Sequence, residues 1–246
     1  ILRLPDMDEV ERLLKTADGD ILRWDAAPEL PGADEFARCM TDNGILCAIA
    51  HSNADSEEAQ RGIDCGFSHV THFYNAVTTY HKEGQTVYGG IVEAAYLNSG
   101  VTVELICDGK HIPRDILRLA LKIKGVNSVA AITDAMRISG TDMKFGKLGS
   151  LANGTDVIAD DGVAKLPDMS SFAGSVATMD RCLKVLCLDY GISLTDASVM
   201  LSGTPARLSR LGDTKGRIQN GMDADMVLVN REMAVTGVIL NGKAVK

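Results

Sequence analysis

Residues 44–76, "GILCAIAHSNADSEEAQRGIDCGFSHVTHFYNA", decide the fold class of this chain. The apolar runs at its two ends carry His51 and His72, and the segment between them finishes with the glycine typical of a helix end. A strand, a helix and a second strand in this order form the repeating unit of a parallel sheet. The stretch therefore predicts an α/β protein with polar residues gathered at the carboxyl ends of its strands.

The same unit repeats along the first half of the chain. Apolar runs ending in polar residues occupy residues 21–29, 44–52, 67–76, 101–111 and 129–135, and helix-like segments lie between them at 32–44, 55–66, 89–100 and 113–125. Both a (β/α)8 barrel and a doubly wound open sheet place their sites at these strand ends. The glycine fingerprints of nucleotide-binding open sheets are missing, which favours the barrel. Because a barrel needs eight units and five are found, we expect the C-terminal portion of a (β/α)8 TIM barrel.

The second half of the sequence has a different pattern. Residues 146–175 are rich in glycine and strand-like runs, helices are expected at 176–191 and 193–212, and the tail at 215–246 alternates short strands with Asn-Gly turns. We expect a partial barrel over residues 1–208 and part of a small β-sandwich domain over residues 209–246. An amphipathic helix with Pro5 in its first turn comes directly after Ile1, and we expect that the sequence starts partway through a longer chain.

The composition disfavours several classes of function. The net charge of −8 over 246 residues argues against nucleic acid and anionic membranes as partners, because both attract basic surfaces. No apolar run approaches the roughly 20 residues that cross a bilayer, and no secretory leader pattern opens the chain. The six cysteines lack CxxC spacing. We expect a cytoplasmic protein with reduced thiols.

His51 and His72 are the candidate metal ligands. Period-2 alternation places His51 on the face of Ile49, and places His72 on the face of Val70, opposite His69. Neighbouring strands lie about 4.8 Å apart, so two imidazoles at the same height can reach one ion. The alternative is a pair of hydrogen-bonded histidines near a core, and we assign His69 to such a structural role.

Other polar residues at strand ends are candidates for chemistry. Asp134 follows four apolar residues, and such a carboxylate is costly to bury unless it lies beside a cation or exchanges protons with a substrate. An N-cap for the next turn is the alternative. Asp108 and His111 share a loop that is either a capped turn or part of a site, and residues 172–175 either begin a helix or cover a ligand. Glu29 is a weaker candidate by position alone.

Five short motifs together carry a resemblance to a known family. They are "AHSNA" (50–54), "THFYNA" (71–76), "DGKH" (108–111), "ITDAM" (132–136) and "FAGS" (172–175). In order and spacing they resemble the N-acetylglucosamine-6-phosphate deacetylases of the amidohydrolase superfamily, over about residues 5 to 246. The resemblance implies a homodimeric hydrolase that uses a divalent metal to remove acetate from a small phosphosugar. Zinc is the expected metal, and iron, manganese and cobalt are the alternatives.

The resemblance also implies roles for single residues. His51 and His72 match two metal ligands, and Asp134 matches the catalytic aspartate. The matching substrate-binding positions are Asn75, Ala76, Lys82, Asp108, Gly109, Lys110, His111, Phe172, Ala173 and Gly174. Lys82 stands near the place of a family arginine that reaches the phosphate, often across a dimer interface, and lysine lacks its bidentate fork. The family's glutamate ligand, in a His-x-Glu-Gly-Pro segment, is absent from this sequence, and Glu29 is not that ligand.

Two other functions stay open. The chain is either an inactive fragment or phosphosugar-binding remnant that needs a partner half to cover its open sheet edge, or an amidohydrolase acting on another substrate. The combination of "THFYNA" with "DGKH" disfavours the latter.

Overall fold

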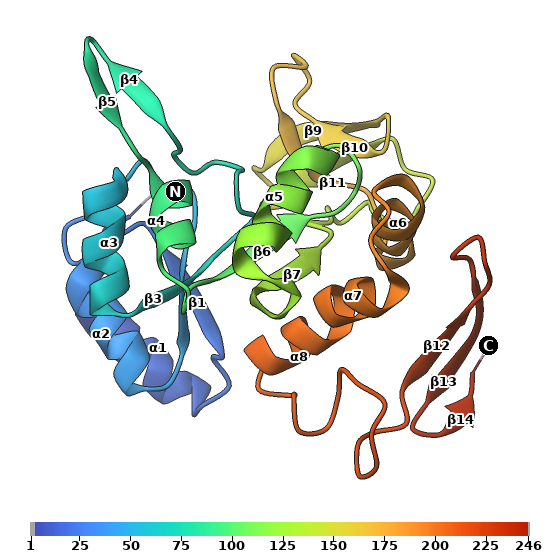
Figure 1. Cartoon of the computed structure of the whole chain (residues 1–246). Coiled ribbons are helices and arrows are strands. Elements are labelled where there is room, and N and C mark those ends of the chain that lie inside the picture. The colour runs from blue at the N-terminus through green and yellow to red at the C-terminus, as the bar shows by residue number, and fades with distance from the viewer. Residues whose placement is uncertain (1–2, 246) are drawn as a thin grey trace.

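The computed structural model describes residues 3–245 of the chain. Its centre is a parallel sheet of five strands in the order β1-β2-β3-β6-β7 (Figure 1). The strands are β1 (Arg23–Ala26), β2 (Leu46–Ile49), β3 (Phe67–Val70), β6 (Thr102–Ile106) and β7 (Val129–Ile132). All five predicted strands are confirmed, and each is added beside the preceding one, whereas a doubly wound sheet would reverse its order. Within the described residues β1 and β7 remain sheet edges, so these strands form an open sheet and not a closed barrel.

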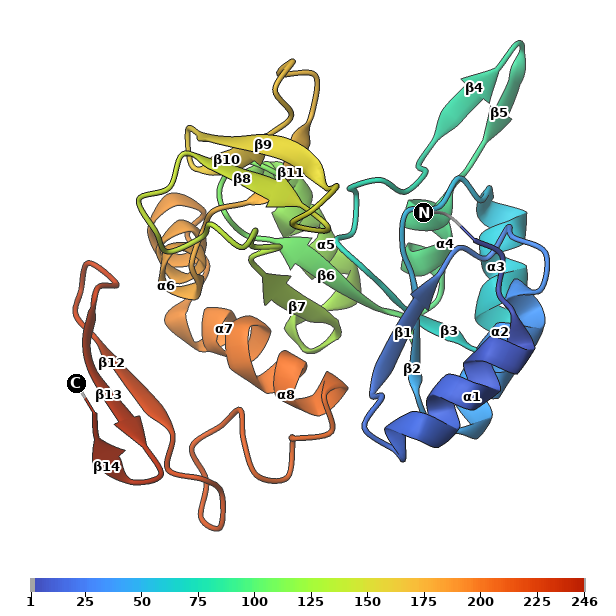
Figure 2. The same cartoon turned by 180° about the vertical axis from the view of Figure 1, so that it is seen from behind.

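One helix precedes this sheet and four connect its strands (Figure 2). They are α1 (Met7–Ala17), α2 (Ala33–Asp42), α3 (Ser56–Cys65), α4 (Ile91–Leu97) and α5 (Arg114–Lys124). The predicted place of Pro5 in the first helical turn is wrong. Asp6 is the N-cap of α1, and its side chain accepts a hydrogen bond from the Glu9 N–H at 3.1 Å, so the proline precedes the cap.

The main core lies between the parallel sheet and the helices. Cys47, Ile49, Val103 and Leu105 on the strands pack in one buried cluster with helix residues such as Met40. Burying a large apolar side chain contributes about 1.5–3 kcal/mol, so this layer fixes the strand order and register. The opposite face of the sheet carries the polar side chains described below.

A second sheet follows β7. It is antiparallel and consists of β8 (Phe145–Leu148), β9 (Thr155–Asp160), β10 (Val163–Lys165) and β11 (Phe172–Ser175). The predicted strand-like character of residues 146–175 is confirmed. The idea that residues 172–175 begin a helix is wrong, because they pair with β10 and α6 (Met179–Lys184) starts only after Thr178.

The C-terminal part begins with helices and ends in a small sheet. Helix α6 continues as a π-helical turn at Val185–Asp189, and α7 (Leu194–Ser198) leads through a similar turn into α8 (Thr204–Leu208). Strands β12 (Met226–Val229), β13 (Val235–Leu240) and β14 (Lys243–Ala244) form an antiparallel sheet at the periphery of the molecule (Figures 1 and 2). The domain boundary at 208/209 and the β-sandwich stay predictions. No helix within residues 3–245 has the length and apolarity of a membrane span.

Candidate metal-binding and catalytic site

Three residues at the carboxyl ends of strands share an uncommon backbone conformation. His51 follows β2, His72 follows β3 and Asp134 follows β7, with φ angles of 48°, 29° and 49°. Positive φ is uncommon outside glycine, although His and Asp adopt it more readily than most residues. Such conformations persist where the surrounding structure holds them, and they cluster at functional sites. The fold thus brings the three residues to the same edge of the sheet.

The two histidine rings meet edge to face. Their Nε2 atoms lie 3.0 Å apart, and their ring planes make an angle of 85°. Ile49 pairs with Val70 across β2 and β3, so the two histidines stand at equal heights. Continued alternation would turn both rings toward the helix layer, where Ile49 and Val70 pack. Both strands end before the histidines, and each histidine has a positive φ, so the regular alternation of an extended strand does not reach them.

The nitrogen pair fits two ligands of a metal ion. Two neutral imidazole nitrogens facing each other need a proton or a cation between them. Tetrahedral zinc at about 2.1 Å from each nitrogen would separate them by about 3.4 Å, close to the observed spacing. The buried Nδ1 of His72 has no hydrogen-bond partner in the described part of the chain, although metal-bound imidazoles use this second nitrogen to fix their orientation. Among residues 3–245 no cluster of three His, Cys, Asp or Glu side chains could hold an ion, so the pair would supply two of the three protein ligands that a catalytic zinc site uses.

The electrostatic surroundings favour neutral imidazole at His51. Burial lowers the pKa of His51, and the neighbouring His72 lowers this pKa further. The charges of Asp134 and Asp25 oppose both effects. A neutral ring keeps the lone pair that a metal requires, and the two carboxylates add the negative potential that attracts a cation.

Asp134 is held in place through its backbone. Its carbonyl accepts a hydrogen bond from the Ser175 N–H at 2.8 Å, and the Ser175 carbonyl accepts one from the Met136 N–H at 2.8 Å. Gly174 allows this approach, because its φ is +91° and a Cβ there would lie 3.0 Å from the Asp134 carbonyl oxygen. Strand β11 therefore fixes the strand end that presents the Asp134 side chain.

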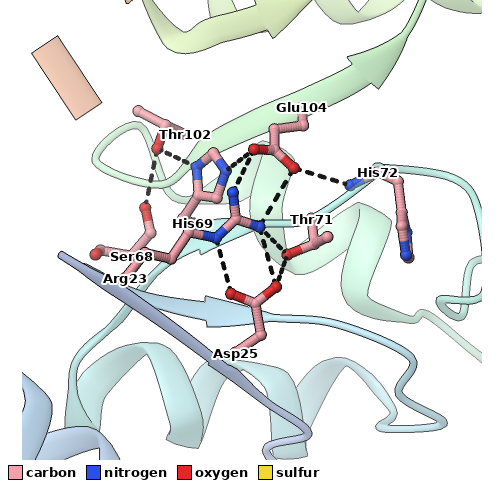
Figure 3. A network of polar contacts seen from close by, with 8 residues as sticks. All are labelled: Arg23, Asp25, Ser68, His69, Thr71, His72, Thr102 and Glu104. Atoms are coloured by element: carbon pink, nitrogen blue, oxygen red, sulfur yellow. Dashed lines mark hydrogen bonds and ion pairs between the residues drawn. The ribbon is translucent and has the colours of Figure 1, made fainter. Parts of the chain in front are cut away.

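A network of charged side chains lies on the face of the sheet away from the helices (Figure 3). The Arg23 guanidinium donates to Asp25 through Nε at 2.8 Å and pairs with Glu104 through Nη1. His69 places Nδ1 at 2.7 Å from the Thr102 hydroxyl and Nε2 at 3.4 Å from Glu104. His69 thus has the structural role expected of it, as one member of a network that joins β1, β3 and β6.

Glu104 connects this network to the histidine pair. Burial raises the pKa of Glu104, but the close approach of His69 and the pairing with Arg23 lower it to about 2. One carboxylate oxygen also accepts a long hydrogen bond from the His72 N–H at 3.5 Å. The sequence interpretation missed Arg23, Asp25 and Glu104. The available signal was a charged residue inside an apolar strand, which is costly to bury unless it is paired.

The loop after β6 is organised around a buried carboxylate. Asp108 accepts hydrogen bonds from the backbone N–H groups of Lys110 and His111 at 2.9 and 3.0 Å. Its other oxygen lies 2.7 Å from Nδ1 of His111. Lys110 reaches Asp161 in the turn between β9 and β10 at 2.6 Å. Gly109 has a φ of +83°. The segment is thus a capped turn, and it also ties this loop to the second sheet.

Four of the remaining predicted substrate positions lie on β11 and in the segment after His72. Phe172, on β11, places its ring centroid 5.0 Å from that of His111 at an interplanar angle of 58°, and the adjacent Ala173 is buried. Asn75 and Ala76 follow His72, and the Ala76 carbonyl accepts a hydrogen bond from the Ser52 N–H at 3.0 Å.

Lys82 lies on a hairpin, and Glu29 contacts the loop that follows His51. Lys82 sits on the exposed hairpin of β4 (His81–Glu83) and β5 (Thr86–Tyr88), which projects from the body of the molecule (Figure 1). Glu29 accepts hydrogen bonds from the Ser52 hydroxyl at 2.6 Å and the Asn53 N–H at 2.7 Å. It therefore supports the loop after His51, and the fold does not bring Lys82 to the other candidates.

The chain is similar to known proteins in both sequence and fold. The sequence matches the amidohydrolase family over residues 10–245. The N-acetylglucosamine-6-phosphate deacetylases of Lysinibacillus sphaericus and Bacillus subtilis (strain 168) are each 29% identical to it, over 97% and 98% of this chain and 59% of their own lengths. The solved structure of an aspartate-to-alanine mutant of the Mycobacterium smegmatis deacetylase, in complex with N-acetyl-D-glucosamine-6-phosphate, matches with a TM-score of 0.89 at 29% identity, covering 98% of this chain and 62% of that one. The Thermotoga maritima deacetylase matches with a TM-score of 0.83 at 30% identity, covering 99% and 63%.

Proposed function

Because the chain belongs to the amidohydrolase family, we propose that it carries the metal-binding and catalytic portion of an N-acetylglucosamine-6-phosphate deacetylase. The products would be glucosamine-6-phosphate and acetate. The chain spans about 60% of the length of the deacetylases it matches, so the activity belongs to the proposal. The observation that carries it is the facing pair of His51 and His72 on the strand edge that also presents Asp134. We also propose that the five parallel strands belong to a (β/α)8 barrel.

In this proposal three residues handle the reacting groups. His51 and His72 would hold a divalent cation, zinc first, which supplies Lewis-acid polarisation of the amide and a water of lowered pKa. Asp134 takes the proton of the attacking water and returns it to the amine nitrogen that leaves. Its fixed backbone supports this role, because a proton acceptor must stay within hydrogen-bond reach of both oxygen and nitrogen.

Substrate recognition is assigned to the loops around this edge. His111 would contact the sugar from the loop after β6, and Phe172 would cover it from β11. Asn75 and the backbone of Ala76 would bind the phosphate. The projecting hairpin that carries Lys82 supports a homodimer in which this lysine serves the phosphate of a second subunit.

The competing proposal is a phosphosugar-binding remnant without turnover. It is favoured by one observation, that only two candidate metal ligands meet in residues 3–245. Both proposals predict binding of the phosphosugar, and they differ in acetate release.

The test measures acetate release from N-acetylglucosamine-6-phosphate with added zinc. We expect turnover that depends on the phosphate group of the substrate. Asp134→Asn should lower this turnover by about 10²-fold or more, because it removes the general acid–base. Asp142→Asn, a change in an exposed loop, is the matched control. Binding without acetate release would favour the remnant, and equal turnover of unphosphorylated N-acetylglucosamine would favour another amidohydrolase.

A further inference from the structure

We propose that Asp108 is a positioning residue that fixes the tautomer of His111. Nδ1 of His111 then carries the proton, and Nε2 presents a lone pair that accepts a hydrogen bond from a hydroxyl group of the bound sugar. The identity of that ligand rests on the proposed function above. The tautomer follows from the contacts of this loop alone.

The two oxygens of Asp108 have separate tasks. Oδ1 accepts the backbone N–H groups of Lys110 and His111, at 2.9 and 3.0 Å. Oδ2 lies 2.7 Å from Nδ1 of His111. Asp108 is fully buried, and these bonds overcome the effect of burial and lower its pKa to about 2. An ionised carboxylate accepts hydrogen bonds and donates none, so Nδ1 must carry the proton.

The other nitrogen of His111 is left for a ligand. The side chain is only 5% exposed, packed against Phe172 on β11. Within residues 3–245 Nε2 makes no hydrogen bond, and it is not among the fully buried polar atoms that lack a partner. The ring is therefore anchored on one side and accessible at one atom. His111 lies in the loop that follows β6. In the sheet β6 stands between β3 and β7, the strands that lead to His72 and Asp134.

The division of tasks makes Asp108→Asn a specific probe. The amide oxygen must take the Oδ1 place, because two backbone N–H groups point there. The amide NH₂ then takes the Oδ2 place and faces Nδ1 of His111. A donor at that position can be satisfied only if Nδ1 loses its proton, so the substitution should keep the turn and reverse the tautomer.

The experiment is a long-range ¹H–¹⁵N NMR spectrum of the histidine rings in the full chain, between pH 7 and pH 9. His111→Gln assigns the signals of His111 by their loss. We expect Nδ1 protonated and Nε2 unprotonated in the unchanged protein, and the reverse in Asp108→Asn. Asp115→Asn, which alters an exposed aspartate at the start of α5, should leave the tautomer as it was.

The unchanged protein alone tests the central claim, even if the variant folds poorly. A protonated Nε2 in that spectrum, or a tautomer that Asp108→Asn leaves unmoved, overturns the proposal. Saturating N-acetylglucosamine-6-phosphate should shift the Nε2 resonance, and an unmoved resonance overturns the acceptor role. None of these readouts requires turnover, so a failure of deacetylation is seen separately.

Discussion

His51 and His72 are separated by 21 positions in the chain, yet their Nε2 atoms lie 3.0 Å apart. The parallel pairing of β2 with β3 and a positive φ at each histidine produce this contact. Each ring is positioned by its own strand, so the contact between the two rings depends on the register of β2 with β3.

The histidine pair should bind zinc weakly in this chain. Two neutral imidazoles supply fewer ligands than the three protein groups of a catalytic zinc site, so we expect a dissociation constant above the micromolar range. Titration calorimetry measures it. His51→Gln should abolish the heat of binding, and His81→Gln, on the projecting hairpin, should not. A sub-micromolar constant would contradict the two-ligand site.

Replacing Glu104 by glutamine should destabilise the protein by about 2–4 kcal/mol at pH 7. Breaking a buried pair leaves Arg23 and His69 without their shared partner, and the partial exposure of Arg23 keeps the loss moderate. Urea denaturation gives the free energy of unfolding. Glu83→Gln on the exposed hairpin is the control, with an expected change below about 0.5 kcal/mol. An equally small change at Glu104 would mean that the network does not stabilise the fold.

Stability should fall as the pH drops below about 4.5. The pKa of Glu104 in the folded protein is about 2, below its ordinary 4.5. The unfolded chain therefore binds the proton first, and the stabilisation is present above pH 4.5 and lost as the pH falls toward 2. We expect this group to contribute a loss of about 2 kcal/mol between pH 6 and pH 3. The difference in unfolding free energy between Glu104→Gln and the unchanged protein should shrink over the same range. A constant difference would show that Glu104 is not the titrating group.

The sheet was predictable from the sequence because each strand is a local signal. Apolar runs with polar ends gave all five strands. The polar network was not predictable in this way, because Glu104 finds its partners His69 and Arg23 only after three strands have aligned. The histidines show the limit most clearly. Regular alternation ends at Ile49 and Val70, where the strands end. Nothing in the local sequence pattern predicts the positive φ of His51 and His72, two residues further on.

Gly174→Ala should disturb the strand end that carries Asp134. It should lower the free energy of unfolding more than the replacement of a glycine without close neighbours would. A Cβ at Gly174 would lie 3.0 Å from the Asp134 carbonyl oxygen and 3.2 Å from Met136, in a φ of +91° that disfavours alanine. That carbonyl cannot move freely, because it accepts the Ser175 N–H. Gly149 supplies the matched control, since its φ is +79° and nothing lies within 4 Å of its Cβ position.

Both alanine variants carry the cost of the left-handed backbone, about 1 kcal/mol, and Gly174→Ala carries the steric cost as well. We therefore expect a loss of about 1 kcal/mol in unfolding free energy for Gly149→Ala and of about 2 kcal/mol or more for Gly174→Ala. The amide resonance of Met136, whose N–H donates to the Ser175 carbonyl, should shift only in Gly174→Ala. Equal losses and an unshifted Met136 amide would show that β11 does not hold Asp134, because the crowding at Gly174 would then have no effect on the strand end.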